Sequence, residues 1–244
     1  MATVVVGATG AVGRAVAQRC AAAVPGGGGT SPAAPLVLVA RGAGPLEALA
    51  DELRMHRHVS VRVVAGDAAT AETVQAAIEA AGGSVARLVW AAGAGKSGAV
   101  QSFTDEDWRR MCDANAGGPI RFVRECLRAD ATRGLEGGVA FVSSILARRP
   151  VKFDAAYGTT KAAVASFARA LHEELAWTAR KASSPPPAVL CLTPSFIEGA
   201  ATDRSVANLL RRQNDRWSGG PEKPTEASAR RRIAESCPGG RVPR

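Results

Sequence analysis

The chain has 244 residues, of which 46% are hydrophobic and 22% charged, a composition typical of a folded globular protein and not of a disordered one. No apolar run approaches the roughly 18 residues that a membrane-spanning helix needs, so we expect no membrane partner. The formal net charge is +9, and residues 203–244 alone carry ten basic and five acidic residues. Basic segments can bind nucleic acid, but aromatic residues make up only 5% of the chain and do not alternate with basic ones. We therefore expect no nucleic-acid partner.

Short apolar runs alternate with helix-like segments along the chain. The runs with the composition of buried strands are Thr3–Val6, Leu36–Ala40, Val59–Val64, Leu88–Ala91, Val139–Ser143 and Val189–Leu192. The segments with helical patterning are Ala11–Ala23, Pro45–Met55, Ala71–Ala81, Asp105–Ala129, Ala155–Arg180 and Ser228–Glu235. Buried strands that alternate with helices form a parallel sheet covered on both faces. The sequence therefore predicts an α/β fold with a doubly wound sheet, in a single domain of residues 1–244 that includes the basic segment 203–244.

The cysteines and histidines indicate neither a disulfide framework nor a metal centre. The cysteines are odd in number, lie far apart and form no CxxC pair: Cys20, Cys112, Cys126, Cys191 and Cys237. This usage favours a reducing compartment, which we take to be the cytoplasm. His56 and His58 lie in a polar stretch before a predicted strand, and we expect no metal site there.

A glycine-rich turn joins the first predicted strand to the first predicted helix. Glycines in this place let the backbone turn tightly and approach a pyrophosphate, whose charge then meets the N-terminus of the helix. The GxxGxxG spacing differs from the usual GxGxxG, and a glycine turn needed only for packing would look the same. In this strand–turn–helix context we predict a Rossmann-type dinucleotide site. Its residues would be Gly7, Thr9, Gly10, Ala11, Val12 and Gly13.

Arg41 directly follows the second predicted strand, whose end carries no acidic residue. In dinucleotide-binding folds this strand ends beside the adenosine ribose, where a carboxylate suits the 2′-hydroxyl of NAD and an arginine suits the 2′-phosphate of NADP. We therefore expect NADP(H) as the cofactor, with Arg41 on its phosphate. Two alternatives stay open: Arg41 points to solvent, or Arg14, just after Gly13, takes the phosphate.

Tyr157 and Lys161 are four residues apart in a predicted helix, so their side chains share one face. A nearby positive charge lowers the pKa of a tyrosine toward working pH, which suits a general acid for carbonyl reduction. Ser144 follows the fifth predicted strand, at the sheet edge where ligands bind, and its hydroxyl can hydrogen-bond a substrate oxygen. The alternatives are a core tyrosine beside a surface lysine, and a serine that only caps a turn.

The glycine turn and the Ser144–Tyr157–Lys161 set resemble the short-chain dehydrogenase/reductase family, over roughly residues 3–202. The resemblance implies that Tyr157 and Lys161 are the family's Tyr-x-x-x-Lys pair and that Ser144 is its catalytic serine. It implies that Asn115 is the helix asparagine that holds a water in a proton relay, and that Lys161 also binds the nicotinamide ribose. Other positions with implied cofactor contacts, including an aspartate at the adenine, are Asp67, Ala92, Gly93, Pro194 and Ile197.

The chain departs from the family pattern at four places, the first of which is the glycine turn, one residue shorter than the family's usual motif. Trp90 and Ala91 replace two asparagines, so the hydrogen bonds that those side chains would give the sheet are absent. Ser195 replaces a glycine near the nicotinamide. Residues 238–244 leave no room for a full seventh strand, which we expect to be absent or truncated. The strand ending Val39-Ala40-Arg41 and the segment 208–220 are loosely similar to the sepiapterin reductase and benzil reductase subgroup.

Together these features predict an NADP(H)-dependent reductase that converts a small-molecule carbonyl (a ketone, a diketone or a pterin side chain) to an alcohol. The alternative is a sensor or scaffold that binds NADP(H) without turnover, against which the complete Ser144–Tyr157–Lys161 set argues. We expect a homodimer through the two longest predicted helices, Asp105–Ala129 and Ala155–Arg180. Three apolar residues after the sixth predicted strand would either form an apolar wall of the substrate site or serve only in packing within the protein: Phe196, Ile197 and Trp217.

Overall fold

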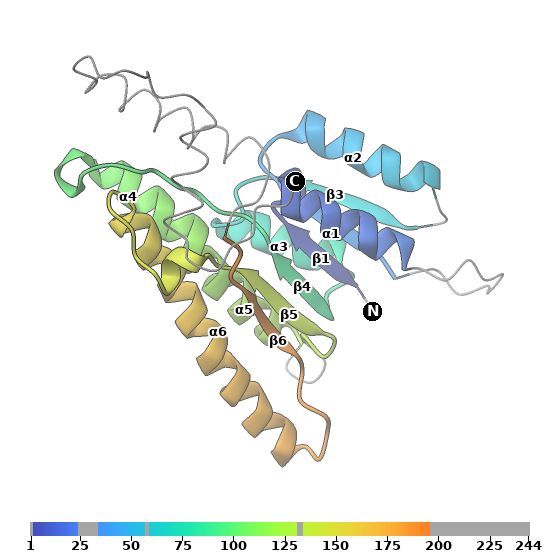
Figure 1. The fold of residues 1–244 in the computed structure, drawn as a ribbon. Coiled ribbons are helices and arrows are strands. Elements are labelled where there is room, and N and C mark those ends of the chain that lie inside the picture. The colour runs from blue at the N-terminus through green and yellow to red at the C-terminus, as the bar shows by residue number, and fades with distance from the viewer. Residues whose placement is uncertain (1, 24–33, 57–58, 131–133, 196–244) are drawn as a thin grey trace, which may run out of the picture. The chain divides into compact units, whose positions relative to one another are not determined.

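Six parallel strands form one sheet in the order β3-β2-β1-β4-β5-β6, as the computed structural model in Figure 1 shows. The structure describes residues 2–23, 34–56, 59–130 and 134–195. The strands are β1 (Thr3–Val6), β2 (Leu36–Ala40), β3 (Val61–Ala65), β4 (Arg87–Trp90), β5 (Gly138–Val142) and β6 (Val189–Leu192). The α-helices are α1 (Ala11–Ala22), α2 (Ala43–His56), α3 (Ala71–Ala80), α4 (Asp105–Cys112), α5 (Gly118–Ala129) and α6 (Ala155–Lys181). Shorter helical segments are η1 (Val100–Ser102), η2 (Asp113–Gly117) and η3 (Ile145–Ala147).

The chain divides into two compact units, Met1–Thr193 and Pro194–Arg244. All the elements named above belong to the first unit, and of the second the structure describes only Pro194 and Ser195. Several predictions therefore lie outside the described residues: the helix Ser228–Glu235, the fate of a seventh strand, and the roles of Phe196, Ile197 and Trp217.

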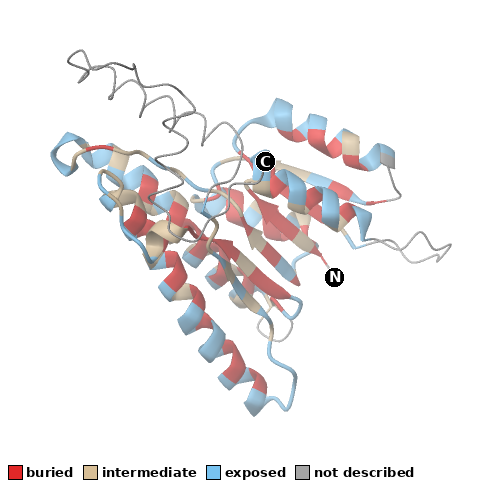
Figure 2. Cartoon of the chain, viewed as in Figure 1, coloured by how far each residue is buried: buried red, intermediate tan, exposed pale blue. Residues whose placement is uncertain are grey.

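Two hydrophobic cores cover the two faces of the sheet, as expected for a doubly wound fold. The fully buried strand β2 shows the alternation: Val37 and Val39 pack into the core shared with α3, α5 and α6, while Leu36 and Leu38 pack into the core shared with α1 and α2. Figure 2 shows buried residues, in red, along the strands and on the faces of the helices that turn toward the sheet. Because both faces are covered, the central strands can be apolar at every position.

The predicted helix Asp105–Ala129 is not a single α-helix. Its middle, Asp113–Gly117, is a π-helical segment between α4 and α5. The N–H of Gly118 bonds to the carbonyl of Asp113, five residues back, and Pro119 has no N–H to continue an α-helical ladder. The other predicted elements within the described residues are confirmed, with ends that differ by at most two residues.

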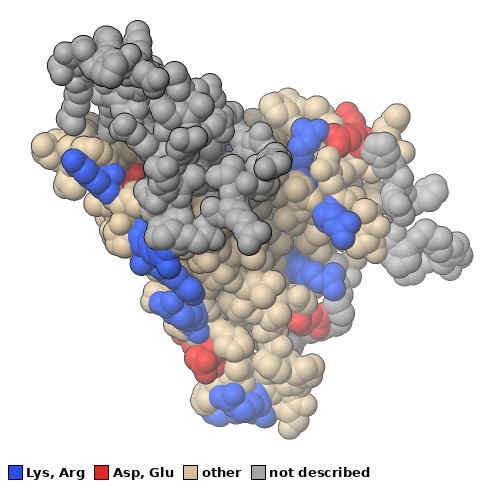
Figure 3. Space-filling model, in the orientation of Figure 1, with Lys and Arg blue, Asp and Glu red and all other residues tan. Residues whose placement is uncertain are grey.

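The described residues contain no group of three or more His, Cys, Asp or Glu side chains that could hold a metal ion. In the same part of the chain, no helix has the length and apolar character needed to cross a membrane. On the face in Figure 3, basic side chains follow α6 toward its C-terminal end and lie in separate groups over α1 and α2.

Candidate active site

The strand order reverses between β1 and β4, which lie side by side in the middle of the sheet. In open α/β sheets, ligands bind outside the carboxyl ends of the strands at such a switch point. The glycine turn follows β1 and the loop of residues 91–99 follows β4, so both lie at this edge. A side chain on Gly7 would meet the backbone of the second loop, with its Cβ 2.5 Å from the Ala92 nitrogen.

The glycine turn is shaped by close backbone contacts. Gly7 has a φ of +80°, and its N–H donates to the Val39 carbonyl at 2.8 Å. A Cβ on Gly13 would lie 2.1 Å from the Gly7 carbonyl oxygen, so only glycine lets α1 pack directly on the turn. Adding a side chain at either position would force the turn and α1 apart.

The N-terminus of α1 is available to an anion. Gly10 precedes the helix and caps it with no side chain, and the first turn contains no acidic residue. The N–H groups of the first helical residues have no partner within the helix, and the helix dipole favours negative charge there. Thr9, Gly10 and Ala11 are exposed. A pyrophosphate fits the cradle of these predicted residues, because the N–H groups of the first helical turn lack helical partners and the residues before them are exposed.

The ends of β2 and β3 carry the residues predicted to meet the adenosine part of a dinucleotide. Arg41 is exposed and makes no ion pair with another described residue, whereas Arg14 on α1 pairs with Glu52 on α2. Asp67 is exposed, and its Oδ1 accepts from the N–H of Ala69 at 2.9 Å in a turn. Arg41 is thus the basic residue at this edge without a carboxylate partner among the described residues.

Ser144, Tyr157 and Lys161 meet at the ends of β5 and α6. The hydroxyls of Ser144 and Tyr157 are hydrogen-bonded to each other. The Lys161 Nζ lies 5.8 Å from the centroid of the Tyr157 ring and donates to the Val142 carbonyl at 2.9 Å. Ser143 holds the start of α6 from the other side, since its hydroxyl donates to the Lys161 carbonyl at 2.7 Å. The predicted catalytic residues therefore lie in one cluster.

Burial controls the protonation of this cluster. Desolvation lowers the pKa of Lys161 from 10.5 to about 8, because a buried ammonium loses its hydration. Burial also raises the pKa of Tyr157, which outweighs the lowering by the hydrogen bond with Ser144; Asp154 raises it further. The expected lowering of the Tyr157 pKa was therefore wrong in direction for this structure. The phenol stays protonated, which is the form that a proton donor needs.

Asn115 is buried in the π-helical segment and joins the cluster to the loop after β4. Its Nδ2 donates to the Ala94 carbonyl at 2.7 Å and to Thr160 Oγ1 at 2.8 Å, and its Oδ1 accepts from the Ala94 N–H at 3.0 Å. Both side-chain N–H groups are thus engaged by protein atoms. A water for a proton relay fits better at the backbone carbonyl of Asn115, whose α-helical donor is missing because residue 119 is a proline.

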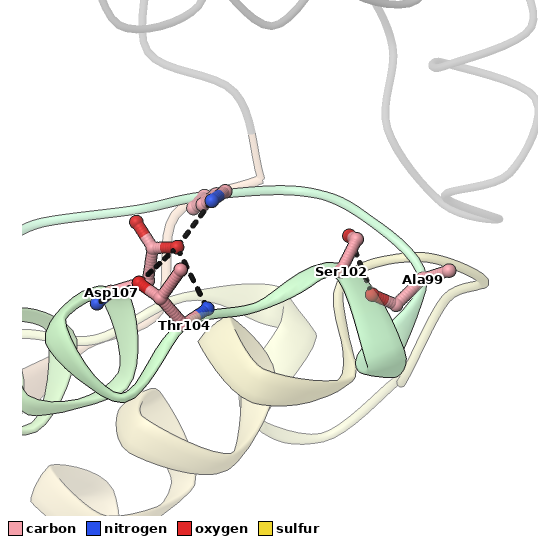
Figure 4. Close-up of polar contacts among 5 residues, drawn as sticks. Ala99, Ser102, Thr104 and Asp107 are labelled. Carbon is pink, nitrogen blue, oxygen red and sulfur yellow. Dashed lines mark hydrogen bonds and ion pairs between the residues drawn. The ribbon is translucent and has the colours of Figure 1, made fainter.

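The loop after β4 contacts both α4, through Lys96, and the Tyr157 ring on α6, through Gly95. Lys96 pairs with Asp107, and this hydrogen bond is the main reason that the pKa of Asp107 falls to about 2. Figure 4 shows Asp107 and Thr104 exchanging hydrogen bonds at the start of α4, each at 3.1 Å, with Ser102 bonded to the Ala99 carbonyl nearby. Within the loop, a Cβ on Gly95 would lie 3.4 Å from the Tyr157 ring.

Ala92 and Gly93 lie in this loop, as predicted. A Cβ on Gly93 would be 3.0 Å from Asn115 Oδ1 and 3.1 Å from Lys161 Nζ, so the backbone passes directly over both side chains. Of the two predicted cofactor residues after β6, Pro194 is described and partly exposed, while Ile197 lies outside the described residues.

Sequence reasoning missed three contributors to the cluster: Ser143, Thr160 and Trp90. Ser143 and Thr160 are polar residues that are buried to 2% exposure each, and only the packing of β5 against α6 reveals this. Trp90 stands where the family has an asparagine, and the sequence predicts only a loss of hydrogen bonds there, but its Nε1 donates to the Ala114 carbonyl at 3.1 Å. The run Gly117-Gly118-Pro119, which cannot continue an α-helical ladder, is the sequence signal that could have indicated an unusual segment near Asn115.

Comparisons with known proteins identify the family and the fold. A family model described as short chain dehydrogenase matches residues 1–198. An uncharacterized oxidoreductase of Staphylococcus epidermidis is 28% identical over 214 residues, which cover 86% of this chain and 85% of that protein. The L-sorbose reductase of Gluconobacter frateurii, solved with NADPH and L-sorbose, is 26% identical with a TM-score of 0.70 and covers 95% of this chain and 88% of its own.

Other solved structures are similar in fold. An alcohol dehydrogenase of the archaeon Thermococcus sibiricus, complexed with 5-hydroxy-NADP, is 27% identical with a TM-score of 0.58, over 71% of this chain and 70% of that one. An NAD⁺-bound xylitol dehydrogenase has a TM-score of 0.76 at 20% identity, over 97% of this chain and 84% of that one, which concerns the fold alone. The glycine turn, the clustered Ser144, Tyr157 and Lys161, and the family match over most of the chain lead to one conclusion: the chain is an oxidoreductase of the short-chain dehydrogenase family.

Proposed function

We propose that the protein is an NADP(H)-dependent carbonyl reductase that converts a small-molecule carbonyl to an alcohol. The observation that carries this proposal is the cluster in which a protonated, half-buried phenol, a buried serine hydroxyl and a buried lysine meet at the carboxyl edge of the sheet. When bound, NADPH supplies the hydride, and the protein supplies orientation and the proton. The proposal therefore assigns each step at the carbonyl oxygen to a residue of the cluster.

Tyr157 donates its proton to the oxygen as negative charge develops there. Ser144 donates a hydrogen bond to the same oxygen and so holds it within reach of the phenol. Lys161 stabilises the phenolate that remains, because its ammonium lies beside the ring in a site of low dielectric. A water at the backbone carbonyl of Asn115 returns the proton to Tyr157.

The preference for NADP(H) is supported by the difference between Arg41 and Arg14. Arg41 follows β2, is exposed and makes no ion pair with a described residue, whereas Arg14 is paired with Glu52. A 2′-phosphate at the end of β2 would meet the free guanidinium without breaking an existing ion pair. The last residue of β2, Ala40, offers no carboxylate to repel the phosphate or to bind a 2′-hydroxyl.

NADPH oxidation against a panel of ketones, diketones, ketoses, quinones and pterins tests the proposal. We expect turnover with at least one class, and we expect Tyr157→Phe to remove that turnover while it leaves NADPH binding intact. The diketone and pterin members also test the loose similarity to the sepiapterin reductase and benzil reductase subgroup. Tight NADPH binding with no turnover on any member would favour the sensor or scaffold instead.

We further propose a homodimer that functions in the cytoplasm. Exposed apolar side chains on α4 and α5 support a protein interface: Trp108 and Ile120 are each 41% exposed. Small residues on α6, such as Ala163 and Ala170, are exposed and would let a second helix approach closely. The four described cysteines are free, which suits a reducing compartment. Light scattering should give the mass of a dimer at micromolar concentration, and a stable monomer would contradict this arrangement.

A further inference from the structure

The carbonyl of Ala114 loses its helical hydrogen-bond donor at the π-helical segment η2. In an α-helix this carbonyl would accept from the N–H of residue 118, but the N–H of Gly118 bonds instead to Asp113. The next residue, Pro119, has no N–H to offer. Neither amide that would ordinarily reach the Ala114 carbonyl therefore satisfies it, and an unpaired carbonyl in the protein interior is unfavourable.

Trp90 supplies the missing donor from the neighbouring strand. It is the last residue of β4, is 2% exposed, and its Nε1 donates to the Ala114 carbonyl at 3.1 Å. Its ring packs edge-on against Phe122 of α5, with centroids 6.0 Å apart. The ring also lies against Gly118, where a Cβ would come within 2.8 Å of two ring atoms. The absence of a side chain at Gly118 thus lets the indole reach the helix backbone.

The segment that Trp90 contacts determines where Asn115 points. Each residue turns a helix by about 100°, so loss of the extra residue in η2 would rotate Asn115 away from its partners. Those partners are Ala94 in the loop after β4 and Thr160 on α6. The Thr160 hydroxyl in turn donates to the Tyr157 carbonyl at 2.8 Å. A hydrogen-bonded path therefore leads from the η2 segment to the backbone of the proton donor.

We propose that Trp90 is a positioning residue, which fixes the π-helical segment through the Ala114 carbonyl and thereby holds Asn115 and the start of α6 in register. This role rests on the proposed function, because it concerns the placement of Tyr157. The indole takes the structural place of the helix donor that Pro119 lacks. Trp90 itself contacts neither substrate nor cofactor in this account.

Trp90→Phe separates the hydrogen bond from the packing, since it keeps an aromatic ring and removes the donor. We expect kcat to fall by about tenfold, the scale of a small misplacement of reacting groups, with KM and the Kd for NADPH changed less than about twofold. Trp177→Phe is the matched control: the residue lies on α6, is 55% exposed, and should leave kcat unchanged.

Hydrogen exchange gives a readout that does not depend on turnover. In the wild type, the Trp90 indole N–H and the Asn115 side-chain amide should exchange slowly, and Trp90→Phe should speed exchange at Asn115. If Trp90→Phe does not fold, wild-type exchange at the four indole groups, assigned by replacing the other three tryptophans, still decides whether the Trp90 bond persists. Fast indole exchange, unchanged Asn115 exchange or an unchanged kcat would overturn the assignment. Absence of turnover in the wild type would reject the proposed function, while the exchange results would still test Trp90.

Discussion

The two halves of the sheet edge carry sites of different construction. At the ends of β1–β3, the candidate groups are backbone amides of the glycine turn and exposed charges, Arg41 and Asp67. At the ends of β4–β6 they are buried polar side chains. Six polar or charged residues are buried in the described part of the chain, and five of them belong to the second half: Asn115, Ser143, Ser144, Thr160 and Lys161.

The difference indicates what each half depends on. In the first half, shape is fixed by close backbone approach, so an added methyl group is the damaging change. In the second half, each buried polar group needs a partner, so removal of a polar atom is the damaging change. Substitutions in the first half should therefore alter cofactor binding, and removal of the Ser144 or Tyr157 hydroxyl in the second half should alter turnover with binding preserved.

The largest effect on cofactor binding is expected at Gly13, where α1 packs on the glycine turn with no side chain between them. Gly13→Val places a Cβ 2.1 Å from the Gly7 carbonyl oxygen, and α1 must move away from the turn to relieve it. We expect NADPH affinity to fall by on the order of a hundredfold or more, close to 3 kcal/mol. Fluorescence titration measures this. Gly44→Ala on α2 is the control, because a Cβ there meets nothing within 4 Å; equal affinities for the two variants would contradict the account of the turn.

Tyr157→Phe tests the second half in isolation. It removes the proton donor and the hydrogen bond with Ser144 without adding bulk. General acids contribute about 10²–10⁴ in rate, so kcat for carbonyl reduction should fall by about that factor. Isothermal titration should give a Kd for NADPH within about twofold of the wild type. A variant that keeps a tenth of the wild-type kcat would remove Tyr157 from its assigned role.

Arg41→Ala and Arg14→Ala show which arginine in the first half binds the 2′-phosphate. Arg14 is already paired with Glu52, whereas Arg41 has no ion-pair partner among the described residues. A charge-assisted contact to a 2′-phosphate contributes a few kcal/mol at most, so Arg41→Ala should weaken NADPH binding about ten- to a hundredfold. NADH binding should hardly change. Dissociation constants for both cofactors measure the ratio. If Arg14→Ala lowers the NADPH preference and Arg41→Ala does not, the phosphate site belongs to Arg14.

The smallest effect is a pH dependence caused by the buried lysine. The Lys161 pKa of about 8 lies below its ordinary 10.5, so between these values the unfolded chain binds more protons and wild-type stability rises with pH. The gain between pH 8 and 9 is about 1 kcal/mol. Lys161→Met lacks this titrating group. The difference in unfolding free energy between the wild type and this variant, measured by urea unfolding without cofactor, should therefore grow by that amount from pH 8 to pH 9. A difference that does not vary with pH would mean that the ammonium is hydrated.

The fold and much of the site could be predicted because the signals are local. Apolar strands alternate with helical segments, the glycine turn follows a strand directly, and the four-residue spacing of Tyr157 and Lys161 sets them on one helix face. The bond from Trp90 to Ala114 could not be predicted, because it requires β4 to be placed against the middle of a helix. The raised pKa of Tyr157 could not be predicted for a related reason. Burial depends on the packed structure, whereas the four-residue spacing of Tyr157 and Lys161 says nothing about it.

An isotope label tests directly whether a carbonyl carbon beside Tyr157 receives the hydride that bound NADPH would supply. NADPH carrying deuterium at the transferred position should be incubated with the most rapidly reduced carbonyl of the panel, and the alcohol analysed by mass spectrometry. We expect one deuterium on the carbinol carbon with the wild type and no labelled product with Tyr157→Phe at equal cofactor occupancy. Alcohol without deuterium, or equal labelling by the two proteins, would contradict it.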